Sequence, residues 1–231
     1  MDCPFQYAMN TKLHNFDWIA ADPKLQKAFN TTMTIRTQRS VGEKWFKVYP
    51  IEDAVTSCNS SEPFLVDIGG GIGHLTLQLK EAYPDIGRCI IQDIEPVIAS
   101  IESLPGGVEA MSADFFKPQP INGAKIYFIA HCLHDWPDKE ARIILGHIKD
   151  AMNEDSVLLL SETVMPERDV PFAAAAADMT MMAAFASLER TEEQFRELLG
   201  SVGLQLVKVW SEETKGVSML GSSVVEARLR R

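Results

Sequence analysis

The stretch "FLVDIGGGIGHLT", residues 64–76, decides the fold because it places four glycines between two apolar segments. Its apolar start has the length and composition of a short buried strand. The segment from His74 predicts a helix that Pro84 ends, although its leucines also alternate as in a strand. Glycine is favoured where the backbone adopts a positive φ or approaches a ligand closely. The stretch therefore predicts a strand, a ligand-binding turn and a helix.

Apolar and amphipathic segments alternate along the chain from residue 64 onward. The segments that predict buried strands are 64–68, 88–94, 125–130, 156–162, 204–210 and 217–229, with a further strand within 108–116. Residues 137–152 predict an amphipathic helix, and another helix begins at a capping box over 191–194 and stops at Gly203. This alternation predicts an α/β fold, with a mostly parallel sheet, helices on both faces and an antiparallel C-terminal strand. A hairpin across residues 212–216 would join the last two strands.

The first 60 residues differ from the rest of the chain. They are rich in aromatic residues and have helix-like segments, but they contain no strand pattern of their own. We interpret residues 1–60 as a helical lid or linker region. Residues 61–231 are then the domain that contains the sheet and the catalytic site.

The composition limits the class of protein. The chain has 231 residues, of which 46% are hydrophobic and 23% charged, and a formal net charge of −10, which fits one globular domain and argues against a nucleic-acid partner. No apolar segment approaches the ~20 residues that a membrane span needs, and the N-terminus lacks the pattern of a secretory signal. The four scattered cysteines predict reduced thiols rather than disulfides or a zinc site. We therefore expect a cytoplasmic protein with a small-molecule ligand.

The spacing of the glycines distinguishes between classes of ligand. Dinucleotide sites favour GxGxxG, in which a pyrophosphate lies on the helix N-terminus. Here Asp67 precedes a GxGxG pattern that includes Gly69 and Gly71. An acidic residue before the turn repels a pyrophosphate and attracts an ammonium group, such as that of S-adenosylmethionine (SAM). The motif thus favours SAM over a nucleotide, and the remaining alternative is a structural turn in which Asp67 accepts hydrogen bonds from loop amides.

Polar residues lie at or after the carboxyl ends of five predicted strands. They are Asp67, Asp93, Asp114, the pair His134–Asp135, and Glu162. The carboxyl ends of parallel strands lie at one edge of a sheet, where ligands bind. Asp93 is placed to accept hydrogen bonds from ribose hydroxyls, and Asp114 to reach an adenine amino group with Phe115 or Phe116 beside the ring. Together these residues predict one pocket.

Several motifs together resemble one family in their order and spacing: LVDIGGGIGH, IIQDIEPVI, ADFF, LHDWPD, LSETVMPE, DMTMM and LERTEEQF. The chain resembles the plant caffeic-acid-type and fungal O-methyltransferases, which use SAM and release S-adenosylhomocysteine. The resemblance covers nearly the whole chain and is strongest to the fungal enzymes of secondary metabolism, through PFQYAMNTKL, FFKPQP and GHIKDAM. It implies the Rossmann-like methyltransferase sheet and a small aromatic hydroxyl substrate.

The resemblance also implies roles for individual residues. It implies that His134 is the general base and that Glu162 and Glu189 hold it. The residues implied to contact SAM are Asp67, Gly69, Gly71, Asp93, Asp114, Phe115 and His131, where relatives usually carry a lysine. The residues implied to line the acceptor pocket are Phe16, Phe29, Met33, Asp135 and Met181. Without the resemblance, Glu189 fits a helix N-terminus and Met181 fits core packing.

The chemistry of methyl transfer agrees with these residue types. A phenol has an unperturbed pKa near ~10 and is a poor nucleophile while protonated. A neutral histidine can take its proton as the methyl group moves, and a carboxylate on the far imidazole nitrogen holds the tautomer. No metal is required. His131 and His134 are three residues apart at a strand end, where we expect them to point to opposite faces rather than to share a metal ion.

Two departures from the family bear on cofactor binding and on activity. Glu95 adds an acid where relatives have DLP, and its charge is expected to affect the binding of ribose or adenine. Relatives are also roughly twice as long and begin with a dimerisation domain that closes the partner's acceptor pocket, and this difference leaves other functions open. A homodimer is thus implied for an intact family member. One alternative function is that of a SAM-binding relative that catalyses a pericyclic rearrangement or a dehydration. The other is that of a non-catalytic SAM-binding fragment.

Overall fold

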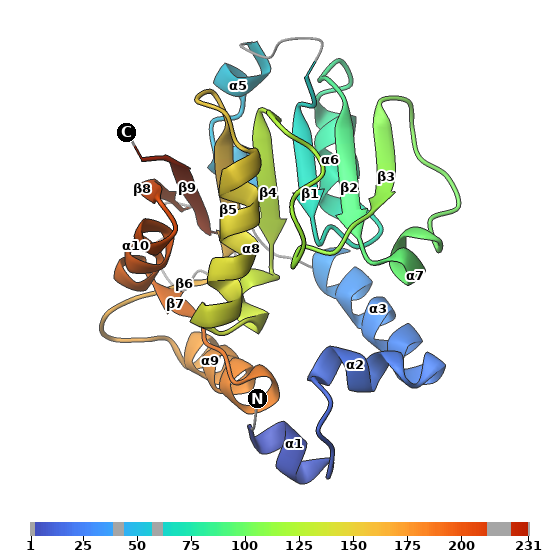
Figure 1. The fold of residues 1–231 in the computed structure, drawn as a ribbon, viewed down its shortest axis with the longest axis vertical. Helices are drawn as coiled ribbons and strands as arrows, with labels where there is room; N and C mark the ends of the chain where they lie inside the picture. Colours follow the sequence, from blue (N-terminus) through green and yellow to red (C-terminus); the bar gives the residue numbers. More distant parts are fainter. Residues whose placement is uncertain (1–2, 39–43, 57–61, 212–222, 231) are drawn as a thin grey trace.

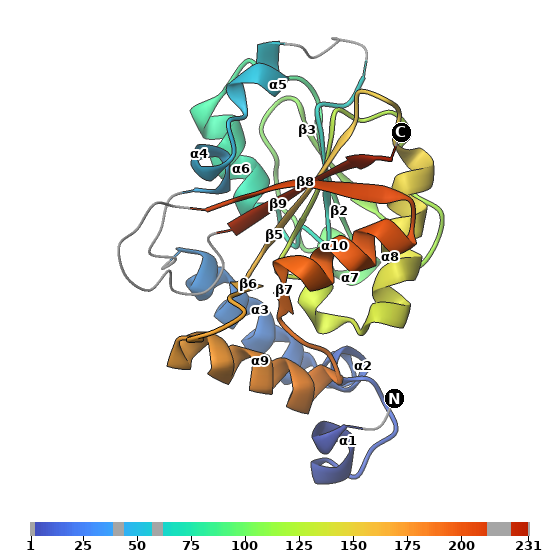
Figure 2. The ribbon, with the colours of Figure 1, turned by 90° about the vertical axis from the view of Figure 1, so that its left-hand side faces the viewer.

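The computed structural model describes residues 3–38, 44–56, 62–211 and 223–230. In these residues one seven-stranded sheet has the order β3-β2-β1-β4-β5-β9-β8. Helices cover both of its faces, with α4, α5 and α6 on one side and α8 and α10 on the other (Figures 1 and 2). The predicted α/β fold is therefore confirmed.

The sheet is parallel except at one strand. The parallel strands are β1 (Leu65–Ile68), β2 (Cys89–Asp93), β3 (Val108–Ser112), β4 (Ile126–Ala130) and β5 (Val157–Glu162). Next to β5, β9 (Ser223–Leu229) runs antiparallel both to β5 and to β8 (Leu204–Trp210). A separate small sheet pairs β6 (Val164–Met165) with β7 (Arg190–Thr191). The antiparallel C-terminal strand is confirmed, while the hairpin expected across 212–216 lies outside the described residues.

The helices alternate with the strands after an N-terminal helical region. That region contains α1 (Pro4–Ala8), α2 (Asn15–Ala20), α3 (Pro23–Gln38), α4 (Trp45–Val48) and α5 (Glu52–Thr56). The later helices are α6 (His74–Ala82), α7 (Glu95–Ile98), the 3-10 turn η1 (Leu133–Asp135), α8 (Asp138–Ala151), α9 (Phe172–Phe185) and α10 (Glu192–Ser201). The ambiguous segment after the glycine turn is thus helical, and Thr191 and Gln194 form the predicted capping box of α10.

The core has one layer on each face of the sheet. On one face, apolar residues of α8 and α10 such as Leu145 and Phe195 pack on the strands. On the other face, Trp45 of α4 stacks on Phe128 of β4 with 4.3 Å between ring centroids. Residues 45–54 thus belong to the sheet's core, whereas α1 to α3 lie with α9 beyond the carboxyl ends of the strands (Figure 1). The division of the chain at residue 60 stays a prediction.

Three glycines of the first turn adopt the left-handed backbone conformation. Gly69, Gly71 and Gly73 have φ values of +70°, +60° and +85°, which L-residues with a side chain rarely adopt. Gly73 is the N-cap of α6, and a Cβ atom there would overlap the side chain of Ile91 on β2. The close approach of helix and sheet therefore requires glycine at this position.

We expect Gly73→Ala to lower the free energy of unfolding by roughly 2–5 kcal/mol, because left-handed strain adds to overpacking against Ile91. Gly71→Ala is the matched control: its φ is similar, but no atom lies within 4 Å of the added Cβ. The control should lose about 1–2 kcal/mol from strain alone. Chemical denaturation without ligand measures both values, and equal losses would contradict the role of Ile91.

Candidate active site

The carboxyl ends of the parallel strands bring the predicted polar residues to one edge of the sheet. Asp67 lies in β1, Asp93 ends β2, Asp114 follows β3, His134 lies in η1 after β4, and Glu162 ends β5. Their common location follows from the parallel register of the five strands. Their placement at one edge is as predicted, and their individual roles stay predictions.

His134 is a buried imidazole that faces three carboxylates. Its Nδ1 lies 3.0 Å from Glu189 Oε1 and 3.5 Å from Glu162 Oε2. Its Nε2 lies 3.7 Å from Asp135 Oδ1. Because an ionised carboxylate only accepts hydrogen bonds, Nδ1 carries a hydrogen and donates it to Glu189. In the neutral ring this arrangement leaves Nε2 as the proton acceptor.

The carboxylates determine the charge of His134. Burial by itself lowers the pKa of His134, but the charge of Glu162, the hydrogen bond to Glu189 and the charge of Asp135 outweigh it and raise the pKa to about 9. The unliganded chain therefore holds an imidazolium at neutral pH. These carboxylates come from three separate segments of the chain, and the role of a neutral His134 as proton acceptor during methyl transfer stays a prediction.

Glu162 and Glu189 are each fixed by backbone contacts. Glu162 Oε1 accepts hydrogen bonds from the backbone N–H groups of Cys132 at 3.1 Å and Leu133 at 2.8 Å. The backbone N–H of Glu189 donates to Asp178 Oδ1 on α9 at 2.9 Å. The second oxygens, Oε2 of both glutamates, are buried without a hydrogen-bond partner among the described residues. Backbone groups therefore hold the carboxylate of Glu162, whereas Asp178 holds the backbone of Glu189 and leaves its carboxylate to contact His134.

The same three side chains form a group that could hold a metal ion. The ligand atoms of His134, Glu162 and Glu189 lie within 4.8 Å of one another. The hydrogen bond between His134 and Glu189 also accounts for this arrangement, so a metal-independent site stays a prediction. His131 is outside the group; its φ is +49°, its backbone N–H donates to Ser161, and its ring centroid is 6.3 Å from that of His134.

Two aspartates accept hydrogen bonds from residues in and just after the glycine turn. Asp67 is buried, accepts a 2.6 Å hydrogen bond from the Thr76 hydroxyl, and has its pKa raised to about 6 by burial. Asp93 accepts hydrogen bonds from the backbone N–H groups of Gly71 and Ile94, both at 2.8 Å. Asp67 thus accepts its hydrogen bond from α6 and not from the loop amides. Each carboxylate oxygen has two lone pairs, so Asp93 can accept further hydrogen bonds from a ligand.

A pocket beside the turn contains several predicted cofactor residues. Gly69, Asp114 and Phe115 line it together, and the exposed Asp114 also accepts a hydrogen bond from the backbone N–H of Phe116. Sequence reasoning missed the other lining residues, which are Ile68, Gln92, Ala113, Lys117, Gln119, Pro120, His147 and Ile148. They lie within stretches that carry the family resemblance, among them FFKPQP and GHIKDAM, so a signal was present although no cofactor role was assigned to them.

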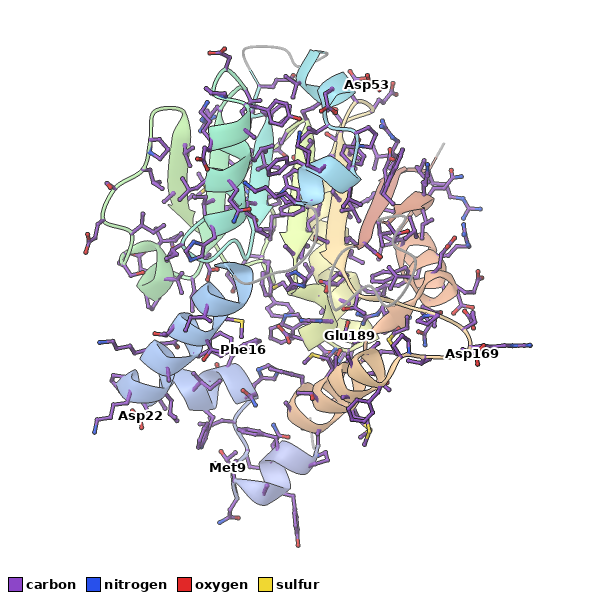
Figure 3. All side chains as sticks on the ribbon, turned by 180° about the vertical axis from the view of Figure 1, so that it is seen from behind. Met9, Phe16, Asp22, Asp53, Asp169 and Glu189 are labelled. Carbon is purple, nitrogen blue, oxygen red and sulfur yellow. The ribbon has the colours of Figure 1, made fainter. Side chains whose placement is uncertain are left out.

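Aromatic rings gather where the acceptor was expected. The ring of Phe16 lies 5.8 Å from Phe29, 5.1 Å from Phe185 and 6.1 Å from Trp136. His14 stacks on Trp136 with 4.7 Å between ring centroids and 7° between planes. Figure 3 labels Phe16, which belongs to α2, and Glu189. Both lie at the end of the sheet near α2, α3 and α9. The rings of the predicted Phe16 and Phe29 therefore come together.

The other expected acceptor residues differ in exposure. Met181 is buried in α9, while Met33 of α3 is 37% exposed. His14, Trp136 and Phe185 were not predicted. Trp136 had a signal, since it follows His134–Asp135 in the LHDWPD motif, but His14 and Phe185 had none.

Comparison with known proteins identifies related chains. Residues 1–205 match the family model described as O-methyltransferase domain. Methyltransferase cfoC of Aspergillus candidus is 39% identical over 89% of this chain and 52% of its own length. Demethylsterigmatocystin 6-O-methyltransferase of Aspergillus parasiticus is 36% identical over 94% of this chain and 56% of its own length. The chain thus spans slightly more than half the length of these curated relatives.

Solved structures share the fold. The structure of LepI in complex with SAM has a TM-score of 0.89 and 34% sequence identity, and the match covers 99% of this chain and 58% of that one. A structure described as a pericyclic reaction enzyme matches with the same TM-score, identity and coverage. The described helices of this chain include none with the length and apolar character of a membrane span.

The raised pKa of His134 predicts how stability depends on pH. A folded-state pKa of about 9 exceeds the unfolded value near ~6.5, so protonated His134 stabilises the fold fully below pH ~6.5 and loses this effect as pH rises to about 9. We expect the stability advantage of wild type over His134→Gln to fall by ~3 kcal/mol across this range. Asp67 is present in wild type and in His134→Gln, so its titration contributes equally to both free energies of unfolding and cancels in their difference.

Denaturant unfolding at several pH values measures this difference. His147→Gln on α8 is the matched control, because it replaces a half-buried histidine that has no recorded contact with Glu162 or Glu189. A pH-dependent difference confined to His134→Gln assigns the effect to the carboxylates beside this imidazole. A pH-independent difference for His134→Gln would show that the carboxylates do not stabilise the imidazolium.

Proposed function

The chain belongs to the O-methyltransferase domain family, and on this premise we propose that it transfers the methyl group of SAM to a phenolic hydroxyl of a small secondary metabolite. The buried contact between His134 and its carboxylates, at the strand ends beside the glycine turn, is the observation that supports this most. A histidine fixed through Nδ1 presents Nε2 to an acceptor hydroxyl as general base. The fungal relatives named O-methyltransferases support the same reaction.

The residues around the turn suit SAM. Asp67, Asp93 and Asp114 are acceptors, which match the hydroxyl, ammonium and amino donors of SAM and would repel the phosphates of a dinucleotide. Asp93 would hold the ribose hydroxyls, and Asp114 the adenine amino group. Gly71 leaves room for a ligand, because no atom lies within 4 Å of the position of a Cβ there.

The protonation of His134 would depend on whether the positive sulfonium of SAM lies beside it. When bound, SAM supplies an electrophilic methyl group and a positive sulfonium. His134 has a pKa of about 9 in the unliganded chain and would give up its proton more readily beside that like charge. Its free Nε2 would then take the phenol proton, while Glu189 and Glu162 stabilise the imidazolium that results. The site would carry one positive charge before and after transfer.

A pericyclic rearrangement or dehydration is the second candidate. One structure similar to this chain is that of a pericyclic reaction enzyme. In such a reaction SAM would act through its charge and would not be consumed. The pairing of His134 with two glutamates favours methyl transfer over a pericyclic rearrangement, because such a rearrangement transfers no proton to a base.

We expect His134→Gln to lower methyl transfer by about 10²–10⁴-fold while SAM affinity, measured by calorimetry, stays within a few-fold. The assay uses SAM and a panel of phenols that includes demethylsterigmatocystin, the compound in the name of a relative. Mass spectrometry should find one added methyl group and released S-adenosylhomocysteine. Unchanged methylation by the variant would exclude His134 as base, an isomeric product with SAM intact would favour the second candidate, and SAM binding without any product would favour a non-catalytic fragment.

A second copy of the chain is the proposed macromolecular partner, and it would cover the apolar face of α9. Phe172, Met179 and Met182 on this helix are 89%, 63% and 51% exposed, and Asp178 is its one charged residue. Contiguous exposed apolar surface of this kind marks interaction sites. α9 lies at one end of the molecule next to α1 (Figures 1 and 2). A cytoplasmic location is also proposed, since Cys3 and Cys132 are free thiols.

Analytical ultracentrifugation tests this dimer. We expect wild type to dimerise and Met179→Glu to weaken the dimer by at least about 10-fold, because a charge would be buried at the interface. Val207→Glu is the matched control, since Val207 is 50% exposed on β8, away from α9. A monomer at all concentrations, or equal weakening by both variants, would contradict the proposed surface.

A further inference from the structure

We propose that Arg190 is a positioning residue that holds the turn carrying His134 in register with its two glutamates. This inference rests on the proposed function, in which His134 is the base. Within the described residues, Arg190 donates no hydrogen bond to the imidazole of His134. It acts instead on the backbone on both sides of His134.

The guanidinium of Arg190 binds three acceptors around the turn. Nη1 donates to the carbonyl of Leu133 at 3.2 Å, and Nη2 donates to the carbonyl of Trp136 at 2.8 Å. Nε and Nη2 also donate to Asp138 Oδ1, at 3.2 and 2.9 Å. Leu133 begins η1 and Trp136 directly follows it. One side chain therefore ties both ends of the turn to the first residue of α8.

The burial of Arg190 is difficult to explain by stability alone. Its side chain is 1% exposed, whereas the side chain of its ion-pair partner Asp138 is 48% exposed. Burying a charge costs several kcal/mol unless it is well paired, and a half-exposed partner is screened by water. An apolar side chain of similar volume would fill the space at lower cost. The directed hydrogen bonds to backbone carbonyls are what such a residue could not supply.

Arg190 and Glu162 hold η1 from opposite ends. Glu162 Oε1 accepts from the N–H groups of Cys132 and Leu133 at the start of the turn, and Arg190 donates to the carbonyls of Leu133 and Trp136. A carboxylate at the N–H end and a cation at the carbonyl end match the partial charges of a helical turn. A three-residue 3-10 turn has few hydrogen bonds of its own, so these two side chains determine where it sits.

The small β6–β7 sheet connects these contacts of Arg190 to the glutamates that face the ring of His134. Glu162 lies two residues before β6, Glu189 directly precedes β7, and Val164 pairs with Arg190. Consecutive residues thus have separate tasks: Glu189 contacts the imidazole, and Arg190 holds the backbone that carries it. A shift at residue 190 would move the ring relative to both glutamates.

The test replaces Arg190 with lysine, which keeps the charge but lacks the planar fork that reaches several acceptors at once. We expect Arg190→Lys to lower kcat by about 10–100-fold, since small displacements of a catalytic group cost this much. The KM for SAM should stay within about 3-fold, because the glycine turn is untouched. Rates are expressed per SAM-binding site titrated by calorimetry, so an unfolded fraction does not contribute.

A second readout is independent of turnover. NMR of ring-labelled histidine, with the His134 signal assigned from His134→Gln, follows its titration against Glu162, Glu189 and Asp135, the charged groups that face it. We expect the midpoint in Arg190→Lys to lie below that of wild type, because the ring is no longer held against both glutamates. If wild type methylates nothing, the proposed function fails, yet this titration still decides the role of Arg190.

Asp138→Asn is the matched control, because it removes the ion pair and leaves the carbonyl contacts of Arg190 in place. We expect its kcat within about 3-fold of wild type and its His134 titration unchanged. Wild-type kcat and titration in Arg190→Lys, or equal effects of both variants, would overturn the proposal. If Arg190→Lys does not fold, Arg190→Gln, which keeps an amide donor for the carbonyl of Trp136, is measured in the same way.

Discussion

The structure depends on one electrostatic constraint: two buried glutamates share a single imidazole. Glu162 is 0% exposed and Glu189 is 4% exposed, so neither charge is solvated by bulk water, and a cation must accompany them. In the unliganded chain that cation is protonated His134, with a pKa of about 9. The need for one positive charge links the resting state to the proposed reaction, in which the charge passes from a sulfonium to the imidazolium.

The sheet supplies the precision that this charge arrangement requires. Glu162 ends β5, a central strand whose residues are all buried, so its carboxylate has little freedom to move. Glu189 lacks such support of its own, because it lies between α9 and the two-residue strand β7. The pairing of β7 with β6 and the contact with Asp178 on α9 provide it. The position of Glu162 is therefore determined by the main sheet, whereas the position of Glu189 depends on local contacts.

Much of this could be predicted from sequence, because parallel strands place the residues that follow them at one edge. Asp93, Glu162 and the glycine turn were found in this way, and the capping box gave the start of α10. The burial of Arg190 and its hydrogen bonds to the turn were not predictable. Its acceptor Leu133 is 57 positions away in the chain, and no local pattern indicates that the two residues meet. The raised pKa of His134 likewise depends on residues that are distant in the chain, Glu162 and Glu189. Residues 45–54 have no strand pattern, so their packing on the sheet was equally hidden.

The catalytic and acceptor parts of the site are built from different layers. His134 and Glu162 come from the strand ends, whereas the half-buried Phe16 and Phe29 come from α2 and α3, which contact one another more than the sheet. Substitutions among these aromatic residues change the shape of the acceptor region without moving a charge. This separation explains in physical terms how one sheet fold can occur in proteins named for different reactions, methyl transfer and a pericyclic reaction among them.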